Sequence, residues 1–262
     1  MTRTAVSKFV LVLLAVAAAA PPAPRAKAAP PASQPAGKKT PYEPSTHYTV
    51  KEMEGWMVHI HNSLLPGGEE AQTGAAAIKQ LRDDMVLVKR WVGDEPLNRL
   101  LKVGIWLDRD STNGPHGRTP VFHYHPGMDW LVKMDFHPGK HKCVEYSRAS
   151  ALVSAARSRS TATILLHELA HAYHDQVLTF DDPDVLAAHK RAGENKDWPR
   201  SDWVVRANHK EFFAGVSTRY HGKKEEREAL AQRDPILWKK LQEVWGKPKS
   251  YTDSPPPGTG SP

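Results

Sequence analysis

The sequence contains a single cysteine, Cys143, among its 262 residues. One cysteine cannot form a disulfide bond within the chain, so a disulfide framework is excluded. Its neighbours in the sequence identify no catalytic partner for a thiolate. We therefore expect Cys143 to be a small buried side chain and not a nucleophile.

Long hydrophobic runs are also scarce. The apolar stretch at residues 9–20 has twelve residues, too few to span a bilayer comfortably. Arg3 and Lys8 precede it and small residues follow, which is typical of a secretory signal peptide. We expect a signal peptide at residues 1–28, cleaved near residue 19 or 28, and export to the periplasm or the extracellular space. An uncleaved N-terminal anchor is the alternative; after signal cleavage no stable membrane span is expected.

No basic block accompanies the net charge of +7, because Lys and Arg are scattered and many alternate with acidic residues. This pattern argues against a nucleic-acid partner. An apolar content of 40% with eight Trp is enough for one hydrophobic core. We expect a monomer with one domain at residues 46–246, between a Pro/Ala-rich linker at 29–45 and a disordered tail at 247–262.

Hydrophobic periodicity predicts a mixed α+β domain. A strand is expected at residues 143–146, before the helix that contains residues 167–171. We expect this strand to form the upper edge of a cleft and to pair with an extended peptide. The last helix is expected to begin after Asp234, to end at Gly246 and to bury Ile236 with its other apolar residues. The expected elements are a hairpin within 48–65, short strands within 101–108, 121–125 and 143–146, and helices at 69–92, 182–190, 208–221 and 234–245.

The most informative stretch is the H-E-x-x-H motif at residues 167–171, which has no charged residue at its two middle positions. On a helix His167 and His171 lie on one face about one turn apart, which suits two imidazoles that bind one ion. Glu168 lies beside that face and can accept a proton from a water molecule at the metal. The motif therefore predicts a zinc site with Glu168 as general base; a core helix with two satisfied histidines is the alternative.

A catalytic zinc usually has three protein ligands. Glu211 is favoured as the third, because a carboxylate beside Phe212 and Phe213 would be costly if unpaired; a surface Glu weakly paired with Lys210 is the alternative. His174 lies on nearly the same helical face as His167, and we expect it to support the site or to pack. The candidates for the third ligand are His174, Asp175, His189, Glu194, His209 and Glu211.

A second metal site is conceivable in the histidine-rich segment 116–141. His123 and His125 alternate onto one face of the expected strand, and His116, His137 and His141 lie in the same region. Scattered histidines of this kind more often form hydrogen bonds or lie at the surface.

Several motifs between residues 48 and 246 resemble the anthrax lethal factor-like group of gluzincin metallopeptidases. The specific ones are the H-E-x-x-H motif and the block Asn208-His-Lys-Glu-Phe-Phe-Ala214; Glu-Gly-Trp56, Gly104-Ile-Trp-Leu107, Tyr124-His-Pro126 with Trp130-Leu131, and Asp234-Pro235 leading to Trp245-Gly246 support them. The resemblance implies an α+β zincin-type domain with a small mixed sheet, in which His167, His171 and Glu211 bind zinc. Relatives tend to carry a Tyr where this chain has Val204, and a Glu where it has Gly215.

The main hypothesis is an exported zinc-dependent peptidase that hydrolyses peptide or protein substrates. The alternative is a zinc-binding scaffold without peptidase activity, which Val204 favours and the retained Glu168 opposes. A third hypothesis is a non-peptide amidase, which the same chemistry permits.

Overall fold

A computed structural model describes residues 42–109, 121–157, 160–199 and 201–247. The expected signal peptide, residues 29–41 of the expected linker, His116 and residues 248–262 of the expected tail lie outside the described residues. The described residues belong to one compact unit, residues 39–262. Helices and a small mixed sheet alternate along them, which confirms the α+β class.

The sheet has five strands in the order β1-β2-β3-β5-β4. The predicted hairpin is confirmed: β1 pairs antiparallel with β2 through a tight turn at Glu54 and Gly55, both with positive φ. Gly55 suits this turn because its φ of 94° is unfavourable for a side chain. The strands are β1 (Tyr48–Met53), β2 (Trp56–His61), β3 (Ile105–Leu107), β4 (Phe122–Tyr124) and β5 (Val144–Tyr146).

The expectation that residues 143–146 form the edge of the cleft is wrong. β5 pairs with β3 on one side and with β4 on the other, so it is an interior strand. β4 is the edge strand at this end of the sheet, and β1 is the edge strand at the other. β4 is antiparallel to β5 and packs next to the helix that carries the H-E-x-x-H motif. Strands of three residues carry too little pattern for the sequence to order them.

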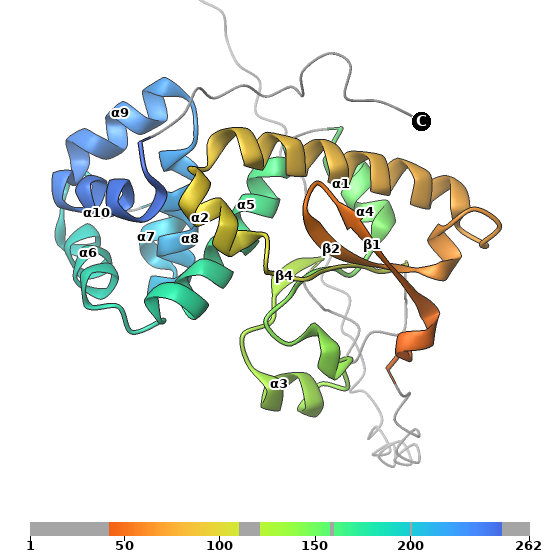
Figure 1. Cartoon of the computed structure of the whole chain (residues 1–262). Helices are drawn as coiled ribbons and strands as arrows, with labels where there is room; N and C mark the ends of the chain where they lie inside the picture. Colours follow the sequence, from red (N-terminus) through yellow and green to blue (C-terminus); the bar gives the residue numbers. More distant parts are fainter. Residues whose placement is uncertain (1–41, 110–120, 158–159, 200, 248–262) are drawn as a thin grey trace, which may run out of the picture. The chain divides into compact units, whose positions relative to one another are not determined.

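Figure 1 shows helices α1, α4 and α5 on one side of the sheet and α3 on the other, while α6 to α10 gather on the side of α5 away from the sheet. The α-helices are α1 (Ala71–Trp91), α2 (Asp94–Leu100), α3 (Met128–Lys133), α4 (Ala149–Ala155), α5 (Thr161–Tyr173), α6 (Pro183–Glu194), α7 (Trp203–Arg206), α8 (His209–Tyr220), α9 (Lys224–Arg233) and α10 (Pro235–Trp245). The shorter helical turns are η1 (Ser45–His47), η2 (Asn62–Leu64), η3 (Pro138–Lys140) and the π-helical η4 (His174–Leu178).

The core lies between the sheet and α1, α4 and α5. Alternate residues of β2, among them Val58 and Ile60, are fully buried there, and they belong to the same core as Leu81 of α1 and Leu165 of α5. The intervening residues of β2, including His59 and His61, therefore face the other side of the sheet. α5 is thus held by packing on its apolar side, which leaves its histidine side for the candidate site.

Several expectations about helices need correction. Sequence patterns did not predict α2, α3, α7 and α9, which are short or strongly polar, and α6 runs to Glu194, beyond the expected end. Asp234 does cap α10 through a hydrogen bond from the Leu237 backbone N–H, and Gly246 ends it. Ile236, expected in the core, is 66% exposed because the first turn of α10 points it outward. Within the described residues, no helix is long and apolar enough to cross a membrane.

Candidate metal centre

Helix α5 supplies two of the three groups at the site. Leu165, Leu166 and Leu169 are fully buried and fix the rotation of the helix. His167 and His171, one turn apart, then share the opposite side, with ring centroids 4.7 Å apart and planes nearly perpendicular. Their Nε2 atoms are 3.2 Å from each other. The sequence spacing therefore does bring the two imidazole nitrogens to one point.

Helix α8 supplies the third group. The Asn208 side chain caps α8 by accepting hydrogen bonds from the backbone N–H groups of Lys210 and Glu211, both at 3.0 Å. This cap places Glu211 in the first turn, where α8 packs against α5. The Glu211 Oε2 lies 3.1 Å from His167 Nε2, and its Oε1 lies 3.4 Å from His171 Nε2. The structure thus gathers the three residues that the sequence proposed as ligands.

The donor set fits a tetrahedral zinc ion. Two zinc–nitrogen bonds of about 2.0–2.1 Å at tetrahedral angles separate their donor atoms by roughly 3.3–3.4 Å. The donor atoms of His167, His171 and Glu211 all lie within 4.8 Å of one another, and their closest separations are 3.1–3.4 Å. Hydrogen bonds to His167 and His171 lower the pKa of Glu211, against the effect of burial, so the carboxylate stays ionised as a ligand must be.

Glu168 stands apart from this cluster. Its side chain is mostly buried, and its Oε2 accepts a hydrogen bond of 3.0 Å from the Tyr124 backbone N–H of the edge strand β4. This contact ties the carboxylate to the edge of the sheet and keeps it from the ligand positions. Sequence patterns did not reveal this contact, because the two residues are 44 positions apart and a backbone N–H has no signature.

The other proposed third ligands are engaged elsewhere. His174 is fully buried against Phe180 and Phe213, and in the described residues neither ring nitrogen has a hydrogen-bond partner. Asp175 accepts from the Tyr124 hydroxyl and pairs with Lys142. The clusters of potential metal donors found in the described residues include none of His174, Asp175, His189, Glu194 and His209. Glu211 is therefore the candidate that the geometry selects.

Val204 and Gly215, the two positions at which the sequence differs from the pattern it resembles, pack against each other. Val204 is 1% exposed and packs over Gly215, where an added Cβ would lie only 2.6 Å from Val204 Cγ2. The side chain of Val204 thus leaves no room for a Cβ at position 215, which is why a glycine fits there. A bidentate ion pair between Arg219 and Asp202 fastens α7 to α8 in this arrangement. Val204 consequently points into the core.

Trp203, which sequence reasoning missed, borders the site instead. Its side chain is exposed (54% of the residue), and its ring lies 5.9 Å from that of His167. Exposure of so large an apolar side chain beside a candidate site was not predictable, because a surface Trp and a core Trp look alike in sequence. The structure thus places an exposed aromatic ring next to His167.

Two further groups of potential donors occur in the described residues. One joins His123 and His125, which the sequence had placed on one strand face, to Glu145 of β5. Its His125 Nε2 lies 2.5 Å from Glu145 Oε2, and Lys140 Nζ lies 2.6 Å from Glu145 Oε1. The other group joins Glu43, His47 and His61. Neither was identified from the sequence as a set, because each includes residues from different elements.

Comparison with family models, curated proteins and solved structures found no match for this chain. The nature of the site therefore has to be argued from its geometry and chemistry.

Proposed function

We propose that this protein is a zinc-dependent peptidase of the H-E-x-x-H type with Glu211 as the third protein ligand. The observation that carries the proposal is the division of roles in the site: three donors converge, while Glu168 is held beside them by the edge strand. A structural site needs no unligated carboxylate at this point, whereas hydrolysis needs a base there.

His167, His171 and Glu211 would hold the ion, and zinc bound there supplies a Lewis acid that polarises a carbonyl and acidifies water. Glu168 accepts a proton from the attacking water and delivers it to the leaving amine. The backbone N–H of Tyr124 orients the Glu168 carboxylate for this transfer. Since a hydrogen bond from the N–H stabilises the carboxylate but leaves its second oxygen available, Glu168 remains able to take up the proton.

The substrate is expected to lie along β4. An edge strand presents backbone groups to which an extended peptide can add, and β4 is the strand beside α5. Trp203, the first residue of α7, offers an apolar surface for a substrate side chain near His167. These features favour a peptide over a small amide, and with the predicted signal peptide they suggest an exported enzyme.

A zinc-binding scaffold without peptidase activity is the second candidate, and the burial of Val204 favours it. A tyrosine at position 204 would lie in the core and could not donate to an oxyanion, and Tyr173 of α5 and Tyr220 of α8 are engaged elsewhere. The Tyr220 hydroxyl donates to the Gly246 carbonyl, and Tyr173 packs on Trp245. A lost oxyanion donor typically lowers the rate by about two to three orders of magnitude.

Digestion of a proteome-derived peptide library by the zinc-loaded protein tests the proposal. The Glu168→Gln variant preserves the size of the side chain but removes the proton acceptor, so cleavage should fall by roughly two to four orders of magnitude. Zinc content, measured on both samples, should be equal. Equal background cleavage by both proteins would reject the peptidase and support the scaffold.

A further inference from the structure

The sheet face opposite α1 and α5 is unusually rich in imidazoles. β2 contributes His59 and His61 to it, β4 contributes His123, and His125 follows directly after β4. Within this face, Glu43 and His47 come from the segment just before β1 and meet His61 at the end of β2. β3 and β5 separate β2 from β4, the strand that contacts Glu168, so this cluster is distinct from the H-E-x-x-H site.

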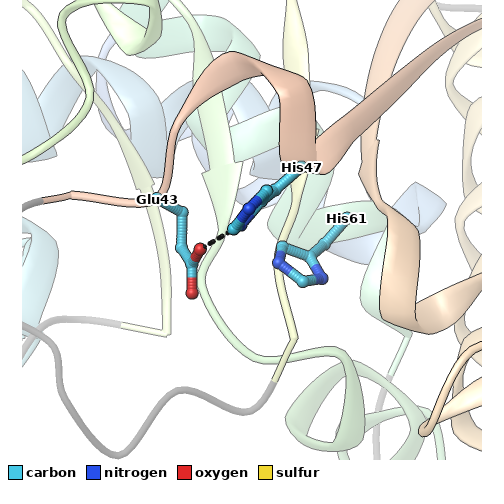
Figure 2. A group of neighbouring side chains, drawn as sticks. All are labelled: Glu43, His47 and His61. Atoms are coloured by element: carbon cyan, nitrogen blue, oxygen red, sulfur yellow. Dashed lines mark hydrogen bonds and ion pairs between the residues drawn. The ribbon is translucent and has the colours of Figure 1, made fainter.

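Glu43, His47 and His61 converge on one space. Their potential donor atoms all lie within 4.8 Å of one another, and His47 Nδ1 lies 2.5 Å from Glu43 Oε2. Figure 2 shows the Glu43 carboxylate and the two imidazoles approaching this space from three parts of the backbone, with a ring nitrogen of His61 facing the other two side chains. The side chain of His47 is 51% exposed, so the space is accessible from solvent.

His61 is the member that needs an explanation. The residue is only 5% exposed, yet its Nε2 has no hydrogen-bond partner in the described residues. Its Nδ1 accepts a hydrogen bond of 3.2 Å from the Ser63 backbone N–H and lies 2.9 Å from the Ser63 hydroxyl. A metal ion at Nε2 would displace the proton from that nitrogen, and the hydroxyl could then accept a proton on Nδ1. Burial lowers the pKa of His61, which favours the neutral ring. A buried imidazole nitrogen without a partner is costly unless a ligand occupies the space before it.

The carboxylate is also prepared for a cation. Arg109 donates to Glu43 Oε1 at 2.6 Å, which leaves Oε2 on the side of the two histidines. Burial opposes ionisation, but the hydrogen bonds to His47 and Arg109 outweigh it and lower the pKa of Glu43. The cluster thus offers one carboxylate and two imidazoles.

The cluster of His123, His125 and Glu145 provides an instructive contrast. There the Lys140 ammonium lies 2.6 Å from Glu145 and 2.5 Å from Asp108, and it is itself buried. A cation is therefore already built into that cluster, and a metal ion would have to displace it. In the described residues, by contrast, the ion-pair partners of Glu43 are Arg109 on one oxygen and His47 on the other.

We propose that Glu43, His47 and His61 form a second metal site, which takes a divalent first-row transition ion such as Zn²⁺. Two imidazoles and a carboxylate suit zinc and its neighbours, whereas Mg²⁺ and Ca²⁺ prefer oxygen ligands throughout. The ion would link η1 and the segment before it to the end of β2. Its role is structural, because none of the three residues is left over as a base beside the ligands.

Metal titration of the tag-free full chain tests this site independently of the peptidase proposal. In a His167→Ala/His171→Ala background the first site has lost two ligands, yet we expect about one equivalent of Co²⁺ or Zn²⁺ to bind. Adding His47→Ala should abolish this binding, and adding Glu43→Gln should weaken it. Both residues lie near the surface, so neither change is expected to unfold the protein.

His59→Ala in the same background is the matched control, because His59 is on the same strand and stacks on Trp106 outside the cluster. The His59→Ala variant should still bind about one equivalent of Co²⁺ or Zn²⁺. The melting temperature gives a second measurement: Zn²⁺ should raise it in the double mutant and in the His59 variant, but not when His47 is also alanine. Failure of the double mutant to bind metal, or binding unaffected by His47→Ala, would overturn the proposal.

Discussion

At the scale of single residues, the proposed role of Glu211 as third ligand most needs a test, because Glu211 lies on a helix that begins more than thirty residues after α5 ends. In a His47→Ala background, which isolates the first site, Glu211→Ala should reduce zinc from about one equivalent to a small fraction, because two imidazoles alone leave the ion largely to solvent. His209→Ala, in the same helical turn, should keep normal stoichiometry. Metal analysis of the purified variants decides, and a zinc-free His209 variant beside a zinc-replete Glu211 variant would reverse the assignment.

Asp84 permits a prediction about stability and pH. Burial raises its pKa to about 7, although hydrogen bonds from Thr161 and Gln80 act in the opposite direction. The carboxyl group of an unfolded chain ionises near pH 4. Between about pH 4 and 7 the folded state therefore retains a proton that the unfolded state has lost, and the free energy of unfolding falls as the pH rises.

Asp84→Asn resembles the protonated acid, so it should remove this fall. The variant should match the wild type near pH 4 and be more stable at pH 8, by up to about 1.4 kcal/mol for each unit of pKa shift. Urea unfolding at both pH values measures the difference. Asp83→Asn, at the neighbouring position of α1, is the control and should leave most of the pH dependence in place, because repulsion from Asp83 is a minor cause of the raised pKa of Asp84. A fall that persists in Asp84→Asn would exclude Asp84 as its source.

The residues of the site differ in how far the sequence could predict them. His167, Glu168 and His171 were predictable as a group because one helical turn contains the two proposed ligands and the proposed base. Glu211 required a choice among six residues, since only packing of α8 on α5 decides which carboxylate or imidazole reaches the histidines. The Tyr124 backbone contact and the meeting of Glu43 and His47 with His61 depend on tertiary structure alone, because no local pattern connects them.

At the scale of elements, α7 and α8 are matched by the pair Val204 and Gly215. An alanine at position 215 would bring its Cβ within 2.6 Å of a stiff β-branched side chain. Gly215→Ala should therefore destabilise the protein by about 1–3 kcal/mol. In a Val204→Ala background the close approach is gone, and the higher helix propensity of alanine should make the same change neutral or stabilising by up to about 1 kcal/mol.

A double-mutant cycle by urea unfolding measures this coupling. Gly193→Ala in α6 is the matched control, because an added Cβ there meets nothing within 4 Å; its effect should be the same with either residue at 204. Additive effects of Gly215→Ala and Val204→Ala would show that the two positions do not compensate each other. Val204→Tyr, for its part, should destabilise α7 through overpacking and leave hydrolysis without a new oxyanion donor.

Among the elements, those with a long repeat or a clear cap were predictable from sequence. The apolar repeat of α1 and the Asp234 cap of α10 both appear as expected. The order of the strands was not predictable, because β3, β4 and β5 have only three residues each. The edge strand expected at β5 is β4 in the structure. This correction matters for the proposed function, because the expected peptide-binding edge is then β4, whose Tyr124 backbone N–H donates a hydrogen bond to Glu168.

At the scale of the whole molecule, the proposed first metal site would join α5, which packs on the sheet, to α8 of the helical group beyond it. An ion bound only to the folded state at 100 to 1,000 times its dissociation constant raises the free energy of unfolding by roughly 3–4 kcal/mol. For a chain of this size such a gain corresponds to a rise of roughly 5–15 °C in melting temperature.

Removal of zinc by a chelator should therefore lower the melting temperature of the His47→Ala variant by that amount, and added zinc should restore it. Glu168→Gln introduced into this variant should keep the full shift, because the base is not a ligand, whereas His167→Ala/His171→Ala should lose it. Thermal scans with and without chelator make the comparison. A shift that disappears with Glu168→Gln would make Glu168 a ligand and remove the base from the proposed mechanism, while a shift that survives loss of both histidines would place the stabilising ion outside the H-E-x-x-H site.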